Sequence, residues 1–565
     1  MNRRELLKWG AFGPGYAYLS KRGFARRIPA SFWDDPKSPR TTPFIARLPL
    51  PDPVLPGKPF KPRGPDLSIL NPKQLRNLQF HRIVAEEVRL ALHPELPPST
   101  IWRYRDVNVP SEQDRFAVGP TIVARMNRPM IVRHSNDLPE DHVGFGVPEL
   151  TVHFHGGHVE ARSDGFPEEI PELQPIYHHG ESYDYFYPFL DVGFSTGDLQ
   201  TGERAATQWY HDHLLDFTGA NVMRGLAGFL LVFDELDAGD ETGKAFPDTN
   251  LRLPSGRFDV PLVIADKLFA PDGSLVYVPE NFGGFLGDRY LVNGAVEPFL
   301  EVAARKYRFR ILCATNARIL GLVVADSRGR RVPYDHIGSG GGLFSRPLRE
   351  DFQLLGPAMR ADIVVDFSEF PPGTELFLEN RIEQEDGRGP GGTFEDVDVE
   401  GSGDRILKFI VGDPAPDPSR VPDVLRPFDA IPDAVIRTLP RRTFEFERRH
   451  GAWAVNGELV DLERSIARPR LDQPEVWKIV NKGGGWWHPI HVHLELFRVL
   501  KLNGKRPRLP ELQDGIGRLD TVLLGGNDEA EVFVRFQDFA GPFVMHCHNV
   551  EHEDHFMMAR FDAVR

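Results

Sequence analysis

Paired histidines are the residues of this chain most able to do chemistry. The sequence has 20 His in 565 residues, and random placement would give about 0.7 His-x-His pairs. Four such pairs occur: His153/His155, His211/His213, His491/His493 and His546/His548. A half-buried strand with hydrogen-bonded imidazoles would explain one pair, but it does not explain four. The pairs therefore predict metal binding.

The tripeptide His546-Cys547-His548 predicts two metal sites side by side. Side chains alternate along a strand, so the two imidazoles would point to one side and Cys547 to the other. The cysteine backbone would then be a short covalent bridge between the two sites. Such a bridge suits a protein that passes electrons from one copper to another.

A loop after Cys547 completes a candidate electron-transfer copper site. One Cys, two His and a weak axial Met describe such a site. His552 and Met557 follow at intervals of five residues, and His488 supplies the second imidazole. Met558 is the competing axial candidate, and we prefer Met557. The eight paired imidazoles then fit three clustered coppers, which together can deliver four electrons to dioxygen.

Length and composition predict several all-β domains. A chain of 565 residues exceeds one core, and its 50 Pro and 53 Gly favour short strands and turns. No run of 18 or more apolar residues occurs, so we expect no membrane-spanning helix. A strand-turn-strand repeat ends at Asn136, Asn316 and Asn481. Three β-sandwich domains follow from this repeat.

Linkers and histidines divide the chain. An acidic segment at 234–250 and a Pro-rich segment at 413–432 separate the three repeats. The paired histidines occur only in the first and third repeats, and the second has a single histidine, His336. We therefore expect a copper-free middle domain, with copper between the first and third. The predicted ranges are 1–30 (export signal), 31–75 (Pro-rich segment), 76–235, 250–412 and 435–565 (the three domains).

The N-terminus and the charge balance indicate an exported protein. Arg3-Arg4 within Met1 to Lys8 resembles a twin-arginine export signal, although a basic N-terminal arm is the alternative. Residues 1–30 carry a net charge of +6. Because the whole chain has a formal net charge of −14, residues 31–565 carry −20. So acidic a body argues against nucleic-acid binding and favours a cationic or neutral substrate. We expect the chain in the periplasm or cell envelope.

The histidine motifs together resemble those of the three-domain multicopper oxidases, over residues 60–565. The chain is most similar to the branch of that family with the spore-coat laccases and bilirubin oxidases. The resemblance implies three cupredoxin-like, Greek-key β-sandwich domains and four copper ions. The motifs are His153-Phe154-His155-Gly156, Trp209-Tyr210-His211-Asp212-His213, His488-Pro489-Ile490-His491-Val492-His493, and His546-Cys547-His548 with His552 and Met557.

The resemblance also implies a role for each position. Asp164 and Glu553 match acids that supply protons to the copper cluster, and Trp486 matches a tryptophan near the electron-accepting copper. Without the resemblance these three would be a turn residue, a surface charge and a packing residue. The implied ligands are His488, Cys547, His552 and Met557 for the type 1 copper; His153 and His491 for the type 2 copper; and His155, His211, His213, His493, His546 and His548 for the type 3 pair.

The resulting hypothesis is a laccase-like oxidase. It would oxidise phenols, aromatic amines or tetrapyrroles one electron at a time and reduce dioxygen to water, acting as a monomer. The alternative is an oxidase of Cu(I) or Mn(II), although the chain has only eight Met and no Met-rich insert. A copper-free scaffold protein is a third possibility. It is disfavoured because all twelve ligand positions carry a ligating residue.

Overall fold

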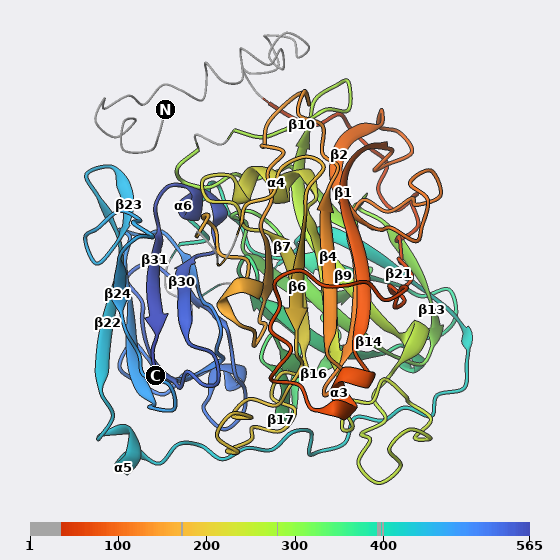
Figure 1. Ribbon diagram of the computed structural model, residues 1–565. Helices are drawn as coiled ribbons and strands as arrows, with labels where there is room; N and C mark the ends of the chain where they lie inside the picture. Colours follow the sequence, from red (N-terminus) through yellow and green to blue (C-terminus); the bar gives the residue numbers. More distant parts are fainter. Residues whose placement is uncertain (1–35, 171–172, 174, 279–280, 392–396, 398–400) are drawn as a thin grey trace.

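The computed structural model describes residues 36–565, apart from 171–172, 174, 279–280, 392–396 and 398–400. Most of the regular structure is β, in six sheets that form three two-layered sandwiches along the chain (Figure 1). This arrangement confirms the predicted all-β fold. The predicted export signal, 1–30, lies outside the described residues. Within the described part of the chain, no helix is long and apolar enough to cross a membrane.

The first sandwich contains the first two histidine pairs. One sheet has the order β2-β1-β4-β6 and the other β3-β8-β7-β5. β1 runs parallel to β4 and β3 parallel to β8, so neighbouring strands are not always consecutive. The strands are β1 (Gln79–Leu90), β2 (Ser99–Asp106), β3 (Gly119–Arg125), β4 (Met130–Asn136), β5 (Val152–His155), β6 (Ser182–Tyr187), β7 (Thr207–Asp212) and β8 (Ala227–Phe233).

The second sandwich has the sheet orders β12-β11-β9-β14-β19-β16-β17, with β10 beside β9, and β13-β21-β20-β15-β18. Its strands are β9 (Asp259–Phe269), β10 (Leu275–Val276), β11 (Arg289–Val292), β12 (Ala295–Val296), β13 (Phe299–Ala304), β14 (Lys306–Cys313), β15 (Leu320–Asp326), β16 (Tyr334–Ser339), β17 (Gly342–Glu350), β18 (Gln353–Leu355), β19 (Arg360–Asp366), β20 (Glu375–Asn380) and β21 (Asp404–Pro414).

The third sandwich has the sheet orders β23-β22-β25-β29-β27 and β24-β31-β30-β26-β28. Its strands are β22 (Arg441–Arg449), β23 (Ala452–Val455), β24 (Ser465–Ala467), β25 (Glu475–Lys482), β26 (His488–Val492), β27 (Phe497–Leu502), β28 (Thr521–Leu524), β29 (Glu529–Val534), β30 (Gly541–Cys547) and β31 (Met558–Ala563). The strands of the three sandwiches thus span 79–233, 259–414 and 441–563. The exact domain boundaries stay a prediction.

Helices are few and short in the described residues. Two of them matter for the site, because α6 lies beside α4 (Figure 1). The α-helices are α3 (Pro72–Arg76), α4 (Thr218–Arg224), α5 (Asp433–Ile436) and α6 (Val550–Asp554), and the 3₁₀ helices are η3 (Ala161–Ser163), η4 (Gly256–Phe258), η5 (Phe367–Glu369) and η7 (Pro510–Leu512).

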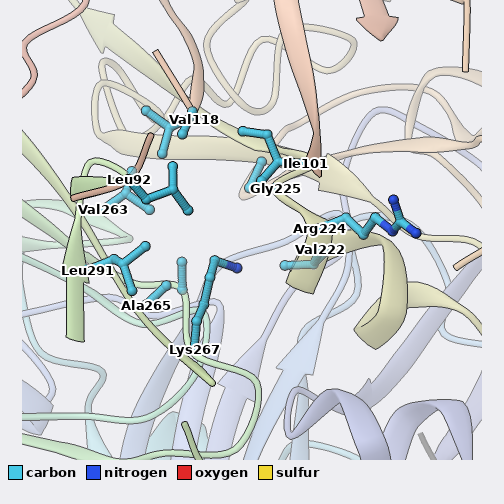
Figure 2. A pocket seen from close by; sticks show the side chains of 14 residues that line it. Leu92, Ile101, Val118, Val222, Arg224, Gly225, Val263, Ala265, Lys267 and Leu291 are labelled. Atoms are coloured by element: carbon cyan, nitrogen blue, oxygen red, sulfur yellow. The ribbon is translucent and has the colours of Figure 1, made fainter. Parts of the chain in front are cut away.

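A small apolar cavity of about 40 Å³ lies where the first and second sandwiches meet (Figure 2). Its wall includes Ile101 from the first sandwich and Val263 and Leu291 from the second. Lys267 extends along this wall, and its ammonium donates a hydrogen bond to the carbonyl of Met223. Burial lowers the pKa of Lys267 to about 8. The cavity wall contains none of the predicted copper ligands.

Candidate metal centre

Two strand ladders bring histidines from distant parts of the sequence face to face. In the first sandwich, β5 pairs with β7 so that His153 lies opposite His211. In the third, β26 pairs with β30 so that His491 lies opposite His546. Directly opposed residues of two antiparallel strands point to the same face of the sheet. Each ladder therefore presents its imidazoles on one face.

The remaining histidines directly follow or end these strands, and backbone hydrogen bonds hold them in line. The His213 amide donates to Thr151, that of His493 to Val544 and that of His548 to Pro489. The two sets of imidazoles then interleave across the boundary between the sandwiches. The His153 ring stacks on His493 with centroids 3.9 Å apart, and the His155 ring stacks on His491 at 3.7 Å. All eight paired histidines thus form one buried cluster.

Three imidazole nitrogens converge inside the buried cluster. The Nε2 atom of His493 lies 3.4 Å from that of His213 and 3.2 Å from that of His546. The Nδ1 atoms of the same rings face carboxylates, Asp164 for His493 and Glu553 for the other two. A neutral imidazole has one N–H, so a ring whose proton faces its carboxylate turns the lone pair of Nε2 toward the other two rings. Their convergence is unfavourable unless a cation lies among them.

The other five clustered imidazoles leave ring nitrogens without hydrogen-bond partners. Buried polar atoms are usually hydrogen-bonded, so an unpaired set in one place calls for an explanation. A metal ion supplies one, since each of these nitrogens could be a ligand atom. Among the described residues, no partner exists for Nε2 of His153, His211 and His491, Nδ1 of His155, or either nitrogen of His548.

The protonation states also fit metal binding. Burial lowers the pKa of His211 to about 3 and that of His548 well below its usual value. Burial, helped by the neighbouring His153, does the same to the pKa of His493. These imidazoles are neutral at physiological pH. A neutral imidazole is the form that binds a metal ion.

Two carboxyl groups touch the outer side of the cluster and differ in protonation. Burial raises the pKa of Asp164 well above its usual range, and its Oδ2 lies 2.7 Å from Nδ1 of His493. Burial acts on Glu553 in the same direction, but His546 and His213, at 3.0 and 3.1 Å, hold the pKa of Glu553 well below its usual range. One acid is therefore held as the carboxylic acid and the other as the carboxylate.

The residue after Asp164 must be a glycine. Gly165 has a φ of +81°, and a Cβ atom there would lie 2.2 Å from the carbonyl oxygen of Val152. Its lack of a side chain lets the chain approach strand β5 closely. Asp164 therefore lies against His153, whose Nδ1 donates to the Asp164 carbonyl. The Asp-Gly turn seen in the sequence positions the acid.

A second site lies around Cys547, within the third sandwich. The sulfur lies 3.3 Å from Nδ1 of His488 and 3.6 Å from Nδ1 of His552, and these two nitrogens are 3.1 Å apart. Burial raises the pKa of the Cys547 thiol well above its usual value, so the thiol is protonated without a metal. A bound metal ion would deprotonate it. Two imidazoles and one thiol in this arrangement match an electron-transfer copper site.

The two candidate axial methionines pack in different hydrophobic clusters. Met557 is fully buried in the same apolar cluster as Cys547, and its carbonyl accepts a hydrogen bond from the Cys547 amide. Met558 packs in a separate cluster with Phe166 and Val544. The packing therefore favours Met557 for the site at Cys547.

Two tryptophans connect this site with the surface. Trp486 is partly exposed and meets the ring of the fully buried Trp453 edge-on, with centroids 5.4 Å apart. Trp453 in turn lies 4.0 Å from the ring of His552 and 5.3 Å from that of His488. Sequence analysis identified Trp486 but missed Trp453. The only available signal was one aromatic residue in a short strand.

The middle sandwich contributes to the cluster through an arginine that sequence analysis also missed. Arg360, on β19, donates two hydrogen bonds to the carboxylate of Asp520. The Asp520 carbonyl accepts from Nδ1 of His491 at 2.8 Å, and its Oδ1 lies 3.4 Å from Nε2 of His155. One ion pair thus links the second and third sandwiches to a histidine of the first.

The histidines outside the motifs stay out of both groups. His158 is buried between Asp538, at 2.9 Å, and Glu495, at 3.3 Å, so it ties the first sandwich to the third. His336 is buried against Glu350 in the second sandwich. Among the others, His178 is largely exposed, His179 is hydrogen-bonded to the Leu138 carbonyl, and the His555 ring lies beside that of Phe282.

Comparison with known proteins agrees with this geometry. Residues 113–237 and 436–564 each match a multicopper oxidase family model. The chain is 31% identical to a bilirubin oxidase from Albifimbria verrucaria, over 93% of this chain and 82% of the relative. It is also 31% identical to a laccase from Bacillus stratosphericus, over 92% and 99% respectively.

A solved structure shares the fold. The McoA multicopper oxidase from the hyperthermophile Aquifex aeolicus superposes with a TM-score of 0.71 at 24% identity, over 92% of this chain and 99% of that protein. At this identity the likeness concerns the fold alone, a three-domain cupredoxin-like architecture. The sequence relatives carry the functional argument. The chain therefore belongs to the multicopper oxidases, copper-containing oxidoreductases that use dioxygen, and within that family it is laccase-like.

Proposed function

We propose that the chain binds four copper ions and couples the oxidation of a small aromatic donor to the reduction of dioxygen to water. His488, Cys547, His552 and Met557 would hold one copper. When bound, copper supplies one-electron redox chemistry: electrons would enter from the donor at the Cys547 site and reach dioxygen at the histidine cluster. The cluster ligands would be His153 and His491 for one ion and, for a pair of ions, His155, His211, His213, His493, His546 and His548.

The convergence of three Nε2 atoms carries this proposal. Their lone pairs meet in a buried space, and the other cluster histidines leave nitrogens unpaired at the same place. Hydrogen bonding alone does not account for such a set. The donors are imidazoles with one thiol, a combination that suits copper.

The two groups of ligands are directly adjacent in the polypeptide. Cys547 belongs to the first site, and its neighbours His546 and His548 belong to the cluster, with ring centroids 5.3 Å apart. Strand β30 ends at Cys547, so alternation sends the thiol into the core of the third sandwich and the imidazoles toward the first. The backbone of this tripeptide would be the short covalent path for electrons.

Asp164 and Glu553 would handle protons. Asp164 is held as the carboxylic acid, and its Oδ1 has no hydrogen-bond partner among the described residues, so this oxygen would hold the proton. Glu553 is held as the carboxylate beside Nδ1 of His213 and His546, and would take up protons from water and pass them toward the cluster. Forming two waters from dioxygen consumes four protons, which gives both acids a task beside the cluster.

The donor would approach at Trp486. Electron transfer without a bond needs only close approach, and the rings of Trp486, Trp453 and His552 are in succession within 5.4 Å. We assign Trp486 the contact with the donor. The charged groups against its ring are the guanidinium groups of Arg388 and Arg448, which disfavours the alternative of a Cu(I) or Mn(II) donor.

The test is a spectrum and a dioxygen electrode. Copper-loaded protein should show an intense blue absorption band and take up dioxygen when a phenol is added. In the Cys547→Ser variant the blue band and phenol oxidation should be lost, while copper remains at the cluster. Phenol turnover by that variant would refute the assignment, and dioxygen uptake with Cu(I) alone would establish the metal oxidase instead.

We further propose export by the twin-arginine route to the periplasm or cell envelope, as a monomer. The support is Arg3-Arg4 and the charge contrast between residues 1–30 and the acidic remainder. Cell fractionation with N-terminal sequencing tests export. Envelope protein that begins at residue 1 would contradict cleavage of a signal, and a mass above 63.8 kDa by light scattering would contradict the monomer.

A further inference from the structure

Two arginines lie against the donor-facing tryptophan. The guanidinium carbon of Arg388 is 4.8 Å from the centroid of the Trp486 ring, and that of Arg448 is 5.1 Å from it. Arg448 also lies 5.6 Å from the centroid of Trp453. Both arginines are exposed. The ring nearest the solvent on the path to the Cys547 site thus lies between two cationic groups.

Strand pairing explains why Arg448 faces this ring and its neighbour does not. In the β22–β23 hairpin Arg448 lies opposite Trp453, so both side chains point to the same face. Arg449 lies opposite Ala452 and therefore points to the other face, where its guanidinium donates to the Gly457 carbonyl. Two adjacent, exposed arginines of one strand thus differ in their access to the two tryptophans.

Backbone contacts fix the position of Arg388. Its carbonyl accepts a hydrogen bond of 2.7 Å from the amide of Trp487. The next residue, Gly389, has a φ of +103°, and a Cβ atom there would lie 2.7 Å from the Trp487 ring. The loop can therefore lie close to the strand that begins at His488. This close approach places the Arg388 side chain over Trp486.

The charges at Trp486 are only partly neutralised. Arg388 has one carboxylate neighbour, Asp386, at 3.5 Å, and both side chains are about 60% exposed, so this pair is weak. Among the described residues, Arg448 has no carboxylate within ion-pair distance, and the indole N–H of Trp486 has no hydrogen-bond acceptor. The surface around the ring therefore offers hydrogen-bond donors and positive charge.

We propose that the aromatic donor of this enzyme carries an anionic group, such as a carboxylate, that these arginines bind. This inference rests on the proposed function, because it concerns the donor of the same site. The donor ring would contact Trp486 while its carboxylate accepts hydrogen bonds from a guanidinium group, a charge-assisted contact. The net charge of −14 favours a cationic or neutral donor, so the local arrangement reverses the expectation from the whole chain.

The reaction balances with a phenolic donor of this kind. Each phenol loses one electron to the enzyme and its phenolic proton to water, and becomes a phenoxyl radical. Four phenols thus provide the four electrons and four protons that convert one dioxygen to two waters. The carboxylate takes no part in the bond changes. Its contact with the arginines affects only how well the donor is captured and oriented.

The test compares two donors that differ only in charge. Syringate has a carboxylate, and methyl syringate has the same phenol without the charge. We would measure kcat/KM for both with the copper-loaded enzyme and take the ratio of the acid to the ester. The variants are Arg388→Gln, Arg448→Gln and their combination, and Arg449→Gln is the matched control from the same strand.

The ratio should fall by about 2- to 5-fold for each arginine removed, the size expected for an exposed charge pair. The Arg449→Gln variant should keep the wild-type ratio. Added salt should lower the ratio in the wild type and have a smaller effect in the double variant. A ratio that is unchanged in the double variant, or that falls equally in Arg449→Gln, would overturn the inference.

The failure of the proposed function has a different signature. If neither syringate nor its ester drives dioxygen uptake by protein that shows the blue band, the aromatic donor itself is wrong, and this inference fails with it. If the ester is oxidised and the arginine variants leave the ratio unchanged, the oxidase function stands and only the anionic donor is refuted.

Discussion

The Arg360–Asp520 ion pair gives a quantitative prediction for the Arg360→Met variant. Both residues are buried, at 3% exposure each, and the guanidinium also donates to the Thr207 carbonyl of the first sandwich. Methionine removes the charge at similar volume and leaves the Asp520 carboxylate buried without a partner. Breaking a buried pair in this way costs about 3–5 kcal/mol. For a domain of this size the loss corresponds to a fall in Tm of about 6–20 °C.

Copper binding should weaken as well, because Asp520 holds two cluster histidines. Its carbonyl accepts from His491 and its carboxylate lies beside His155, so a shifted Asp520 would misplace both rings. Loss of such supporting contacts typically lowers metal affinity about 10- to 100-fold. We therefore expect the Arg360→Met variant to retain less copper per chain after dialysis against a chelator. The copper should be lost from the histidine cluster, while the blue band of the Cys547 site stays normal.

Calorimetry of the copper-free chain and metal analysis of the loaded chain are the measurements. The control is Arg47→Met, which breaks an ion pair with Glu301 whose side chains are 68% and 55% exposed, and whose loss should cost at most about 1 kcal/mol. Adding Asp520→Leu to Arg360→Met should recover part of the lost stability, since the uncompensated charge is gone. A Tm for Arg360→Met no lower than that of the Arg47→Met control would refute this reasoning.

Three further predictions concern single side chains. Asp164→Asn should slow dioxygen reduction more than reduction of the Cys547 site in stopped-flow experiments, because the amide holds no transferable proton; equal slowing of both steps would contradict the proton role. Met557→Leu should raise the reduction potential of the Cys547 site in a redox titration, whereas Met558→Leu should leave it unchanged, because an axial thioether tunes such a site. For Lys267 the folded pKa of about 8 lies below the ordinary lysine value of 10.5, so the unfolded chain binds more protons between these pH values and stability rises with pH there. The free energy of unfolding of Lys267→Met minus that of the wild type should therefore be higher at about pH 7 than at about pH 10, by up to about 3 kcal/mol in urea unfolding. A difference that does not change with pH would contradict the burial of the Lys267 charge.

The convergence of the candidate copper ligands was predictable because they come in short motifs. A strand repeats every two residues, so His-x-His places two imidazoles on one face whatever the rest of the fold does. The same local rule gives the separation of Cys547 from its neighbours. The glycine-and-proline-rich composition and the three repeats likewise led to an all-β, three-domain architecture.

The supporting residues were not predictable, because packing between domains brings them together. Arg360 and Asp520 are 160 positions apart, and no periodicity connects them. A partial signal existed in the apolar strand Arg360–Asp366, because a buried charge is costly unless it is paired. The sequence does not say where the partner is. Trp453 and the two arginines at Trp486 likewise acquire their roles only through contacts across loops.

Helix α6 shows how one short element can couple both proposed copper sites to the other domains. Successive side chains of a helix point about 100° apart, so four consecutive residues point in four directions. Glu551 accepts hydrogen bonds from Tyr277 and Asn316 of the second sandwich, and Asp554 accepts from the first backbone amides of α4 in the first. Between them, His552 faces Cys547 and Glu553 faces the cluster histidines.

A consequence follows for the order in which the site forms. His552 can take its place beside Cys547 only when α6 has its helical turn. The anchors of that turn are the groups that donate hydrogen bonds to Glu551 and Asp554, and these groups belong to the other two sandwiches. The third sandwich alone contains every ligand of the Cys547 site, yet it lacks these anchors. Docking of all three sandwiches should therefore precede tight copper binding at Cys547, and an isolated fragment of residues 435–565 should bind copper there more weakly than the whole chain.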